Sequence, residues 1–396
     1  MHNETAATPG GPTARTRKVL YLCGYDPRGA SHYYSLYRDE AAKARAVTGS
    51  AYKLSPRKRN GRFSANWTIE SDTTRCDYEF LGWDDIIRNY WPKSPFSILW
   101  HAAHLYAYYT LTGTAAKIRR TSRTHFFTFI YPLIFLLILL VSSLGVALFA
   151  GTAIGALLPG YRLEWLATPL IAITVFLRLG EYLEKRFNFY WLLRIYSFFI
   201  TLSKSKVKDF DAHIQRYAEH LLDTLERNEY DEVLLVGHSV GTILLPLVVA
   251  RALSLDPQLR GARSRLALLT LGHCIQDVTL LPHAEAVREA IRTAASAGIF
   301  WLDVTSPPDG ACFPLVDVAE GSGLLRSAHQ PRYPLSISAR FHKMFSPEHY
   351  RKIKRDRMRI HFQYLMAGDY QTEYNYFDIT AGPLTLEQRY AKHRAN

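Results

Sequence analysis

The sequence predicts an α/β protein with a mostly parallel sheet flanked by helices, into which a hairpin of membrane helices is inserted. In both outer parts of the 396-residue chain, short apolar runs alternate with amphipathic stretches of helical length, which is typical of parallel sheets covered by helices. Between these parts, residues 126–158 contain no charged side chain. The string Gly-His-Ser-Val-Gly at 237–241 separates an apolar run from a stretch long enough for a helix.

The first outer part, residues 18–86, predicts alternating strands and a helix. Residues 1–17 before it are polar and include Pro9-Gly10-Gly11-Pro12, so we expect a disordered tail. The predicted elements are a strand at 19–23, a loop at 24–29, a helix at 31–46, an edge strand at 64–71 and a core strand at 78–83.

The second outer part, residues 205–396, continues this alternation. An amphipathic helix is predicted at 210–228 because its apolar residues recur on one helical face. The further predicted elements are strands at 233–236, 266–271, 299–304, 335–341 and 358–364, and helices at 242–253 and 284–297. We therefore expect one sheet assembled from both outer parts.

Residues 87–204 are predicted to be a membrane insertion. The uncharged run at 126–158 exceeds the roughly 20 apolar residues that a bilayer-spanning helix needs. A second apolar run at 162–179 is shorter. It either crosses with Arg162 and Arg178 reaching the interface, or returns as a re-entrant or interfacial helix. Aromatic residues are frequent in 187–202, which predicts a helix lying in the interface.

The basic residues predict how this insertion is oriented. They precede the first apolar run and follow the second, as expected at cytoplasmic ends (Lys117, Arg119, Arg120 and Arg123; Lys185, Arg186 and Arg194). Two crossings return the chain to the same side, which a domain assembled from both outer parts requires. We therefore expect a multi-pass protein of an inner or plasma membrane with its α/β domain in the cytoplasm. Since much of the net charge of +13 borders the membrane, we expect no nucleic-acid partner.

Ser239, at the centre of the Gly-x-Ser-x-Gly string, is the candidate nucleophile. A sharp turn between a buried strand and a helix strains the serine backbone, and the glycines leave room for the strand and helix to approach. Such a turn exposes the serine hydroxyl, while the N–H of Val240 and the first turn of the helix face developing negative charge. An ordinary turn serine near a helix N-terminus is the alternative. His238, beside the nucleophile, is expected to pack near the turn and not to react.

This order of elements around the string resembles the α/β-hydrolase fold, over residues 18–86 and 205 to about 380. The resemblance implies an acid after the second strand beyond the serine and a histidine after the final strand. Asp309, in the loop that follows the strand at 299–304, matches the acid, and Asp303 inside that strand is the alternative. His361 is the preferred histidine because its His-x-x-Tyr-Leu string is similar to the segment that carries the histidine in several lipase-like hydrolases. His342 is the alternative.

The same resemblance implies an oxyanion hole formed by the backbone N–H groups of Val240 and Tyr25, although the His-Gly-Gly-Gly string of many esterases is missing. In the implied mechanism the histidine takes the Ser239 proton, and Asp309 orients the histidine. The sequence contains no phosphate-binding loop and no metal-binding motif, so we expect no cofactor.

We expect a membrane-anchored serine hydrolase that cleaves carboxylic esters through an acyl-enzyme intermediate. Lipid or acyl esters are the favoured substrates because the domain is held at a bilayer. An acyltransferase that uses the same triad and a catalytically silent membrane scaffold on a hydrolase fold are the alternatives.

Overall fold

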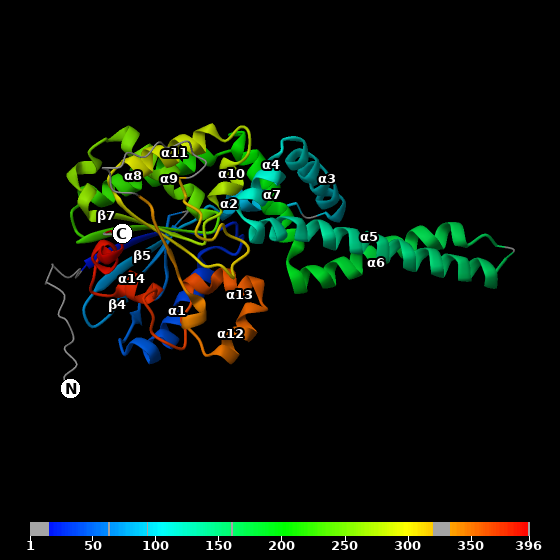
Figure 1. The fold of residues 1–396 in the computed structure, drawn as a ribbon, viewed down its shortest axis with the longest axis horizontal. Coiled ribbons are helices and arrows are strands. Elements are labelled where there is room, and N and C mark those ends of the chain that lie inside the picture. Colours follow the sequence, from blue (N-terminus) through cyan, green and yellow to red (C-terminus); the bar gives the residue numbers. More distant parts are fainter. Residues whose placement is uncertain (1–15, 62–63, 93, 160, 320–332, 395–396) are drawn as a thin grey trace. The chain divides into compact units, whose positions relative to one another are not determined.

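The computed structural model describes residues 16–61, 64–92, 94–159, 161–319 and 333–394. The chain divides into two compact units. The first comprises Met1–Arg88, Val207–Thr279 and Glu285–Asn396, and the second comprises Asn89–Lys206 and Leu280–Ala284. The first unit is an α/β domain built on a mostly parallel mixed sheet, and the helices of the second unit include a long hairpin (Figure 1).

The sheet of the first unit has the strand order β2-β4-β5-β1-β6-β7-β8-β9, and β3 pairs with β4. The six strands from β5 to β9 in this order run parallel, whereas β4 is antiparallel to β5 and to both β2 and β3. The strands are β1 (Thr16–Leu22), β2 (Lys53–Leu54), β3 (Lys58–Asn60), β4 (Ser64–Glu70), β5 (Arg75–Leu81), β6 (Glu232–His238), β7 (Leu266–Leu271), β8 (Phe300–Thr305) and β9 (Leu335–Ser338).

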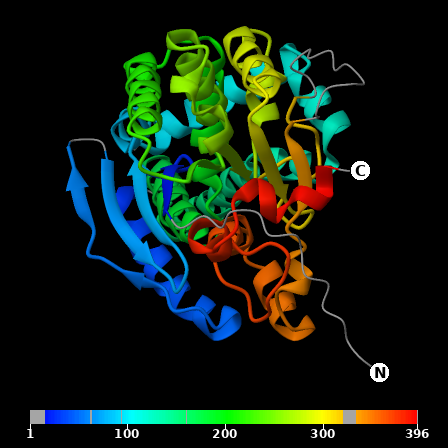
Figure 2. The same cartoon turned by 90° about the vertical axis from the view of Figure 1, so that its left-hand side faces the viewer.

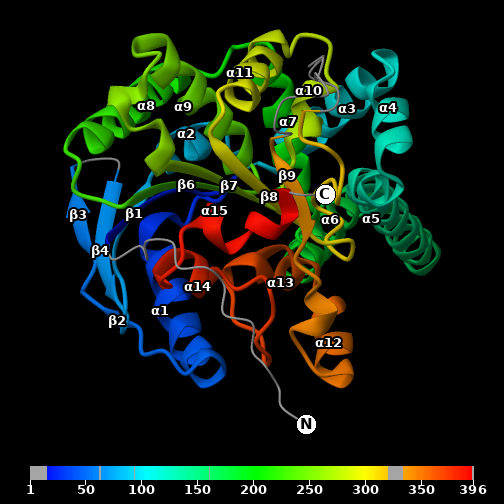
Figure 3. The same ribbon diagram turned by 60° about the vertical axis from the view of Figure 1, so that its left-hand side comes forward.

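The core of the first unit lies around the central strands. Strands β6, β7 and β8 are buried at every residue, which explains why they read as continuous apolar runs and not as alternating ones. Helices α8, α9 and α11 cover one face of the sheet, and α1, α13 and α14 lie on the other (Figures 2 and 3). The helices of this unit are α1 (Gly29–Thr48), α2 (Asp84–Asn89), α8 (Phe210–Glu226), α9 (Gly241–Leu255), α10 (Ile275–Thr279), α11 (Glu285–Ser296), α12 (Pro347–Lys354), α13 (Arg357–Phe362), α14 (Tyr376–Ala381) and α15 (Leu386–Arg389).

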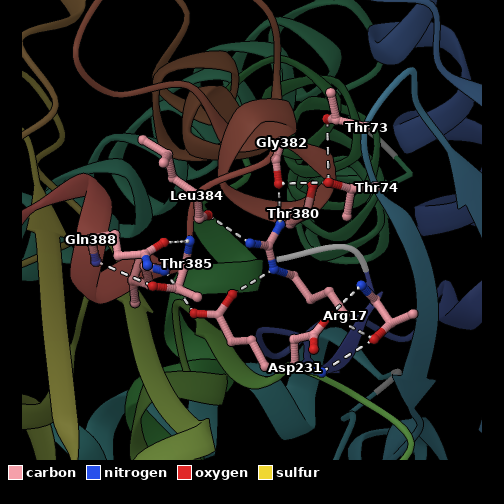
Figure 4. Close-up of polar contacts among 12 residues, drawn as sticks. Arg17, Thr73, Thr74, Asp231, Thr380, Gly382, Leu384, Thr385 and Gln388 are labelled. Carbon is pink, nitrogen blue, oxygen red and sulfur yellow. Dashed lines mark hydrogen bonds and ion pairs between the residues drawn. The ribbon is translucent and has the colours of Figure 1, made fainter. Parts of the chain in front are cut away.

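A buried ion pair fastens the end of the chain to the sheet (Figure 4). The guanidinium of Arg17, on β1, contacts the Glu232 carboxylate of β6 at 2.5 Å. It also donates to the carbonyl oxygens of Gly382 at 3.0 Å and Leu384 at 2.6 Å. The second carboxylate oxygen of Glu232 accepts the N–H of Leu386 at 2.7 Å. Both charges are therefore paired and hydrogen-bonded, which a fully buried arginine requires.

The second unit contains α3 (Pro95–Leu111), α4 (Thr114–Thr121), α5 (Arg123–Leu157), α6 (Glu164–Phe187) and α7 (Phe189–Ser203). Helices α5 and α6, of 35 and 24 residues, are long and apolar enough to cross a membrane. They pack against each other as a hairpin (Figure 1). Small residues permit this close packing, because a Cβ on Gly151 of α5 would lie 2.0 Å from the hydroxyl oxygen of Thr168 on α6.

The structure corrects three expectations about the helical unit and the N-terminus. The apolar run predicted at 162–179 belongs to a continuous helix that ends at Phe187, because the charged residues after Arg178 are also helical. The aromatic helix predicted to lie in the interface is α7, and most of its large side chains are buried, with α3 and α5 packed against it. Residues 1–15 of the predicted tail lie outside the described residues, but Thr16 and Arg17 belong to β1, where the pair with Glu232 holds them.

The structure also corrects two strand predictions near the C-terminus. The strand predicted at 358–364 is wrong, since α13 begins after Asp356, whose side chain caps the helix by accepting the N–H of Arg359 at 2.9 Å. Ile360, His361 and Phe362 are consecutive and all buried, whereas a strand with one buried face would bury only every second residue. The strand predicted at 335–341 ends at Ser338, because Arg340 adopts a positive φ of 47° and a short 3₁₀ turn follows.

Candidate active site

The carboxyl ends of β1 and β6 form the point at which the strand order reverses. The chain leaves β1 toward β5 on one side and later returns as β6 on the other side of β1. In open α/β sheets such a switch point is the usual place for a ligand-binding crevice. The loop after β1 and the turn after β6 both begin here.

Ser239 occupies the turn between β6 and α9. Its φ is +56°, in the left-handed region that non-glycine residues seldom adopt, and its N–H donates to the carbonyl of Leu271 at the end of β7 at 3.0 Å. The side chain is half-buried. This strained strand-turn-helix geometry is the one expected for a nucleophile elbow.

The two glycines of the string are both needed for close backbone contacts. A Cβ on Gly237 would lie 2.6 Å from the carbonyl oxygen of Gly241, and one on Gly241 would lie 2.1 Å from the carbonyl oxygen of Leu22. A larger residue at Gly241 would therefore push α9 away from β1, and one at Gly237 would push α9 away from β6. The sequence prediction that the glycines make room for the turn is confirmed.

The loop after β1 lies against Ser239. A Cβ on Gly24 would lie 2.9 Å from the Ser239 Cβ and 3.2 Å from its hydroxyl oxygen. Tyr25, proposed from the sequence as the second oxyanion donor, follows directly and is buried. Val240, the other oxyanion donor expected from the sequence, is buried at the N-cap of α9, where its N–H belongs to the positive end of the helix.

The loop after β1 is braced by an ion pair that sequence reasoning did not identify. Asp26 is buried, and its carboxylate accepts from the guanidinium of Arg28 at 2.9 and 2.6 Å and from the Tyr33 hydroxyl at 3.2 Å. The Arg28 guanidinium also lies 5.3 Å from the ring centroid of Phe362, the residue after His361. These contacts connect the loop after β1 to α13.

Asp309 and His361 come together. Asp309 lies in the loop after β8, and its Oδ2 is 2.9 Å from Nδ1 of His361 on α13. Burial opposes ionisation of Asp309, but the charge and hydrogen bond of His361 and the N–H of Ala311 outweigh it, so the pKa of Asp309 is lowered. A carboxylate at Nδ1 accepts the Nδ1–H, and an imidazole held in that tautomer presents its Nε2 lone pair as a base.

His238, in the turn that contains Ser239, contacts His361. Its Nε2 donates to the backbone carbonyl of His361 at 3.0 Å, and the two ring centroids are 5.0 Å apart. Burial, reinforced by the nearby charge of His361, lowers the pKa of His238 to about 3, so this imidazole stays neutral. The prediction that His238 packs near the turn is confirmed, and its contact adds a restraint on His361.

The two alternative residues lie elsewhere. His342 is an exposed residue of the 3₁₀ turn Phe341–Lys343, and its ring faces Tyr350. Asp303 is fully buried inside β8, where its carboxylate accepts the Thr270 hydroxyl at 2.7 Å. Burial raises the pKa of Asp303 to about 8, so it is held largely protonated at neutral pH. The structure therefore pairs Asp309 with His361 and leaves both alternatives out of this pair.

The surroundings of Asp309 could not be identified from the sequence. The thiol of Cys312 lies 3.3 Å from the Asp309 carbonyl oxygen and 3.7 Å from the hydroxyl of Tyr364. The Tyr364 ring also faces Gly272, where a Cβ would lie 2.7 Å from the ring and 3.2 Å from Asp309 Oδ2. No spacing in the sequence connects these residues, because the loops after β7 and β8 and the turn after α13 meet only in the fold.

Comparison with known proteins adds no identification, because no family model, curated protein or solved structure matches this chain. In the part of the chain that the structure describes, no group of three or more His, Cys, Asp or Glu residues is arranged to hold a metal ion.

Proposed function

We propose that this protein is a membrane-anchored serine hydrolase of the α/β-hydrolase class that cleaves carboxylic esters. The observation that carries the proposal is the strained Ser239 turn at the switch point of a mostly parallel sheet, with the hydrogen-bonded pair of His361 and Asp309 tied to the same turn through His238. The chain order of serine, acid and histidine is also the order of that class.

In this reaction the Ser239 oxygen attacks the ester carbonyl carbon while His361 Nε2 takes the hydroxyl proton. Val240 and Tyr25 stabilise the oxyanion through their backbone N–H groups. The imidazolium then gives the proton to the departing alcohol, which leaves the acyl group on Ser239. Water, activated by the same imidazole, releases the acid and restores the serine. Asp309 fixes the tautomer and stabilises the imidazolium throughout.

The membrane part of the proposal rests on α5 and α6. Their length and apolar character suit two crossings of a bilayer, and basic residues lie near both outer ends. Two crossings leave the α/β unit on one side, the cytoplasmic side by the positive-inside rule. Because the catalytic unit is covalently joined to the hairpin, lipid or acyl esters are the substrates most available to it.

Labelling with a fluorophosphonate probe tests the catalytic proposal. Isolated membranes that contain the intact chain are treated with the probe, and labelling of the native protein is compared with that of Ser239→Ala. Ser254→Ala, which changes an exposed serine of α9, is the matched control. We expect labelling to disappear only in Ser239→Ala. Native protein that is folded and yet unlabelled would argue against hydrolysis and acyl transfer alike.

The histidine assignment has its own pair of variants. His361→Ala should abolish labelling, whereas His342→Ala, at an exposed position, should retain it. The opposite result would transfer the role to His342. Following a released acyl group with and without alcohol or amine acceptors then separates hydrolysis from acyl transfer.

Reporter fusions before Phe126 and after Leu202 test the membrane topology. Reporters found on opposite sides of the membrane would exclude the hairpin.

A further inference from the structure

Helix α3 is predominantly apolar, and protein covers only one of its faces. Residues 95–111 contain no Asp, Glu, Lys or Arg. One face, which includes Leu105 and Tyr109, is buried. The opposite face exposes Phe96 by 66%, Trp100 by 74% and Leu111 by 86%. A helix that is hydrophobic on all sides is normally enclosed by protein or by lipid, so this exposed face calls for a partner.

The exposed residues of α3 form one continuous strip. Phe96, Trp100, Ala107 and Leu111 are all exposed, and their spacings of four, seven and four place them on one helical face. His104 and Thr110 are exposed polar side chains beside this strip. We call these four apolar residues the α3 strip.

The covered face of α3 holds it at the beginning of the hairpin. The Tyr106 hydroxyl donates to the carbonyl oxygen of Phe129 at 3.0 Å, and the Tyr109 ring stacks on the Phe129 ring with centroids 4.9 Å apart. Phe129 lies in the second turn of α5, which begins at Arg123. Helix α3 therefore lies beside the start of α5, far from the end where α5 turns into α6 (Figure 1).

The charge of this region favours an anionic surface. From Ile86 to Leu163 the sequence contains no acidic residue, and every charged side chain in this stretch is basic. Lys117, Arg119 and Arg120 on α4, and Arg123 at the start of α5, are exposed. Basic residues next to an apolar helix face are the combination by which in-plane helices bind anionic lipid headgroups.

We propose that α3 is an in-plane membrane helix whose strip inserts into the headgroup region of an anionic bilayer, with the basic residues of α4 binding the lipid phosphates. This inference rests on the proposed crossing of the bilayer by α5 and α6. It adds a second membrane contact at the end of α5 that the positive-inside rule assigns to the cytoplasm. Such a contact would hold the helical unit in a fixed orientation at the membrane surface.

Site-directed spin labelling of the full chain in lipid nanodiscs tests this inference. A label on Trp100→Cys reports on the α3 strip, one on Phe149→Cys reports on the exposed side of α5, and one on Glu289→Cys reports on the surface of α11. The native cysteines are all buried. The measurement is the accessibility of each label to oxygen, which concentrates in lipid, relative to a water-soluble nickel complex.

We expect the oxygen-to-nickel ratio at Trp100→Cys to lie well above that at Glu289→Cys and to approach that at Phe149→Cys. A lipid-like ratio at Phe149→Cys with a water-like ratio at Trp100→Cys would overturn the inference about α3 and leave the hairpin intact. A water-like ratio at Phe149→Cys would overturn both. A label at Trp100→Cys that neither probe reaches would indicate a protein partner and would also overturn the inference.

A charge comparison tests the choice of lipid. Replacing Lys117, Arg119 and Arg120 by Gln should remove the rise in the ratio at Trp100→Cys that we expect when anionic lipid is added to zwitterionic nanodiscs. The matched control replaces Arg351, Lys352 and Lys354, three exposed basic residues of α12, and should retain that rise. An absence of any response to anionic lipid in the native background would refute the role of the phosphates.

Discussion

The replacement Gly24→Ala should disable Ser239 without unfolding the protein. Gly24 is separated from Ser239 by more than half of the chain, yet a Cβ at this position would lie 2.9 Å from the Ser239 Cβ and 3.2 Å from its hydroxyl oxygen. The atoms that would collide belong to Ser239, the proposed nucleophile. The substitution therefore tests whether the loop after β1 and the turn after β6 act as one site.

The size of the effect follows from this distance. Carbon atoms in contact are about 3.5–4.0 Å apart, so the loop and the serine must separate by roughly 0.6–1.1 Å to admit the methyl group. A displacement of about 1 Å in an active site costs on the order of 100-fold in rate, or about 2.7 kcal/mol of activation free energy. We expect a loss of this size, since the shift also moves the N–H of Tyr25.

The assay is the second-order rate constant for fluorophosphonate labelling of Ser239, measured together with the thermal midpoint of unfolding. Gly145→Ala is the matched control, because a Cβ at Gly145 would meet no atom within 4 Å. We expect the control to label at the native rate. A native labelling rate in a folded Gly24→Ala protein would refute the contact between the loop after β1 and Ser239 as a determinant of reactivity.

Three further substitutions test the buried acidic residues. Asp309→Asn preserves the shape of the side chain but cannot hold His361 in the tautomer whose Nε2 acts as the base. The rate of ester hydrolysis should therefore fall by roughly 10³–10⁴-fold. A native rate would exclude Asp309 as the acid. Asp303→Asn should make stability less dependent on pH. The folded pKa of about 8 lies above the ordinary value of 3.8, so between these pH values the unfolded chain releases a proton that the folded chain retains. The contribution of Asp303 to the free energy of unfolding is thus fully present below about pH 4. It is lost as the pH rises through about 8, by up to about 1.4 kcal/mol per pH unit. Urea unfolding at pH 5, 6 and 7 should show a shallower decline in Asp303→Asn, and an unchanged slope would contradict the raised pKa. Glu232→Ala leaves the Arg17 guanidinium buried without its counter-charge and should lower the free energy of unfolding by about 3–5 kcal/mol. The control Glu226→Ala, at the exposed end of α8, should lower it little. Equal urea midpoints for the two variants would refute this account.

Local signals explain which parts of the fold were predictable from the sequence. The strands at 233–236, 266–271 and 299–304 were found because strands buried on both faces must be apolar at every position. The turn at Ser239 was found because its glycines, strand and helix are contiguous in the chain. The α/β class with a mostly parallel sheet was predictable for the same reason, since it depends on the order of such local patterns.

Elements whose stability comes from distant contacts were harder to predict. Helix α13 has only six residues, too few for helical periodicity to be distinguished from the alternation of a strand. The length of α6 was underestimated because its last turns carry charged residues, including Lys185 and Arg186. The Asp26–Arg28 pair could not be assigned to the site, because an aspartate two residues before an arginine in a turn has no special meaning outside its tertiary setting.

The choice between His361 and His342 shows most clearly where sequence reasoning ends. Both follow Asp309 in the chain, and the order of residues cannot separate them. The structure separates them by two restraints on His361 that come from different elements: the Asp309 carboxylate at Nδ1 and the His238 Nε2–H at the backbone carbonyl. The second restraint begins at the residue before Ser239, so any shift of the Ser239 turn also acts on the histidine. A neutral, buried His238 thus couples the proposed base to the proposed nucleophile, a positioning role that its place in the Gly-His-Ser-Val-Gly string did not indicate.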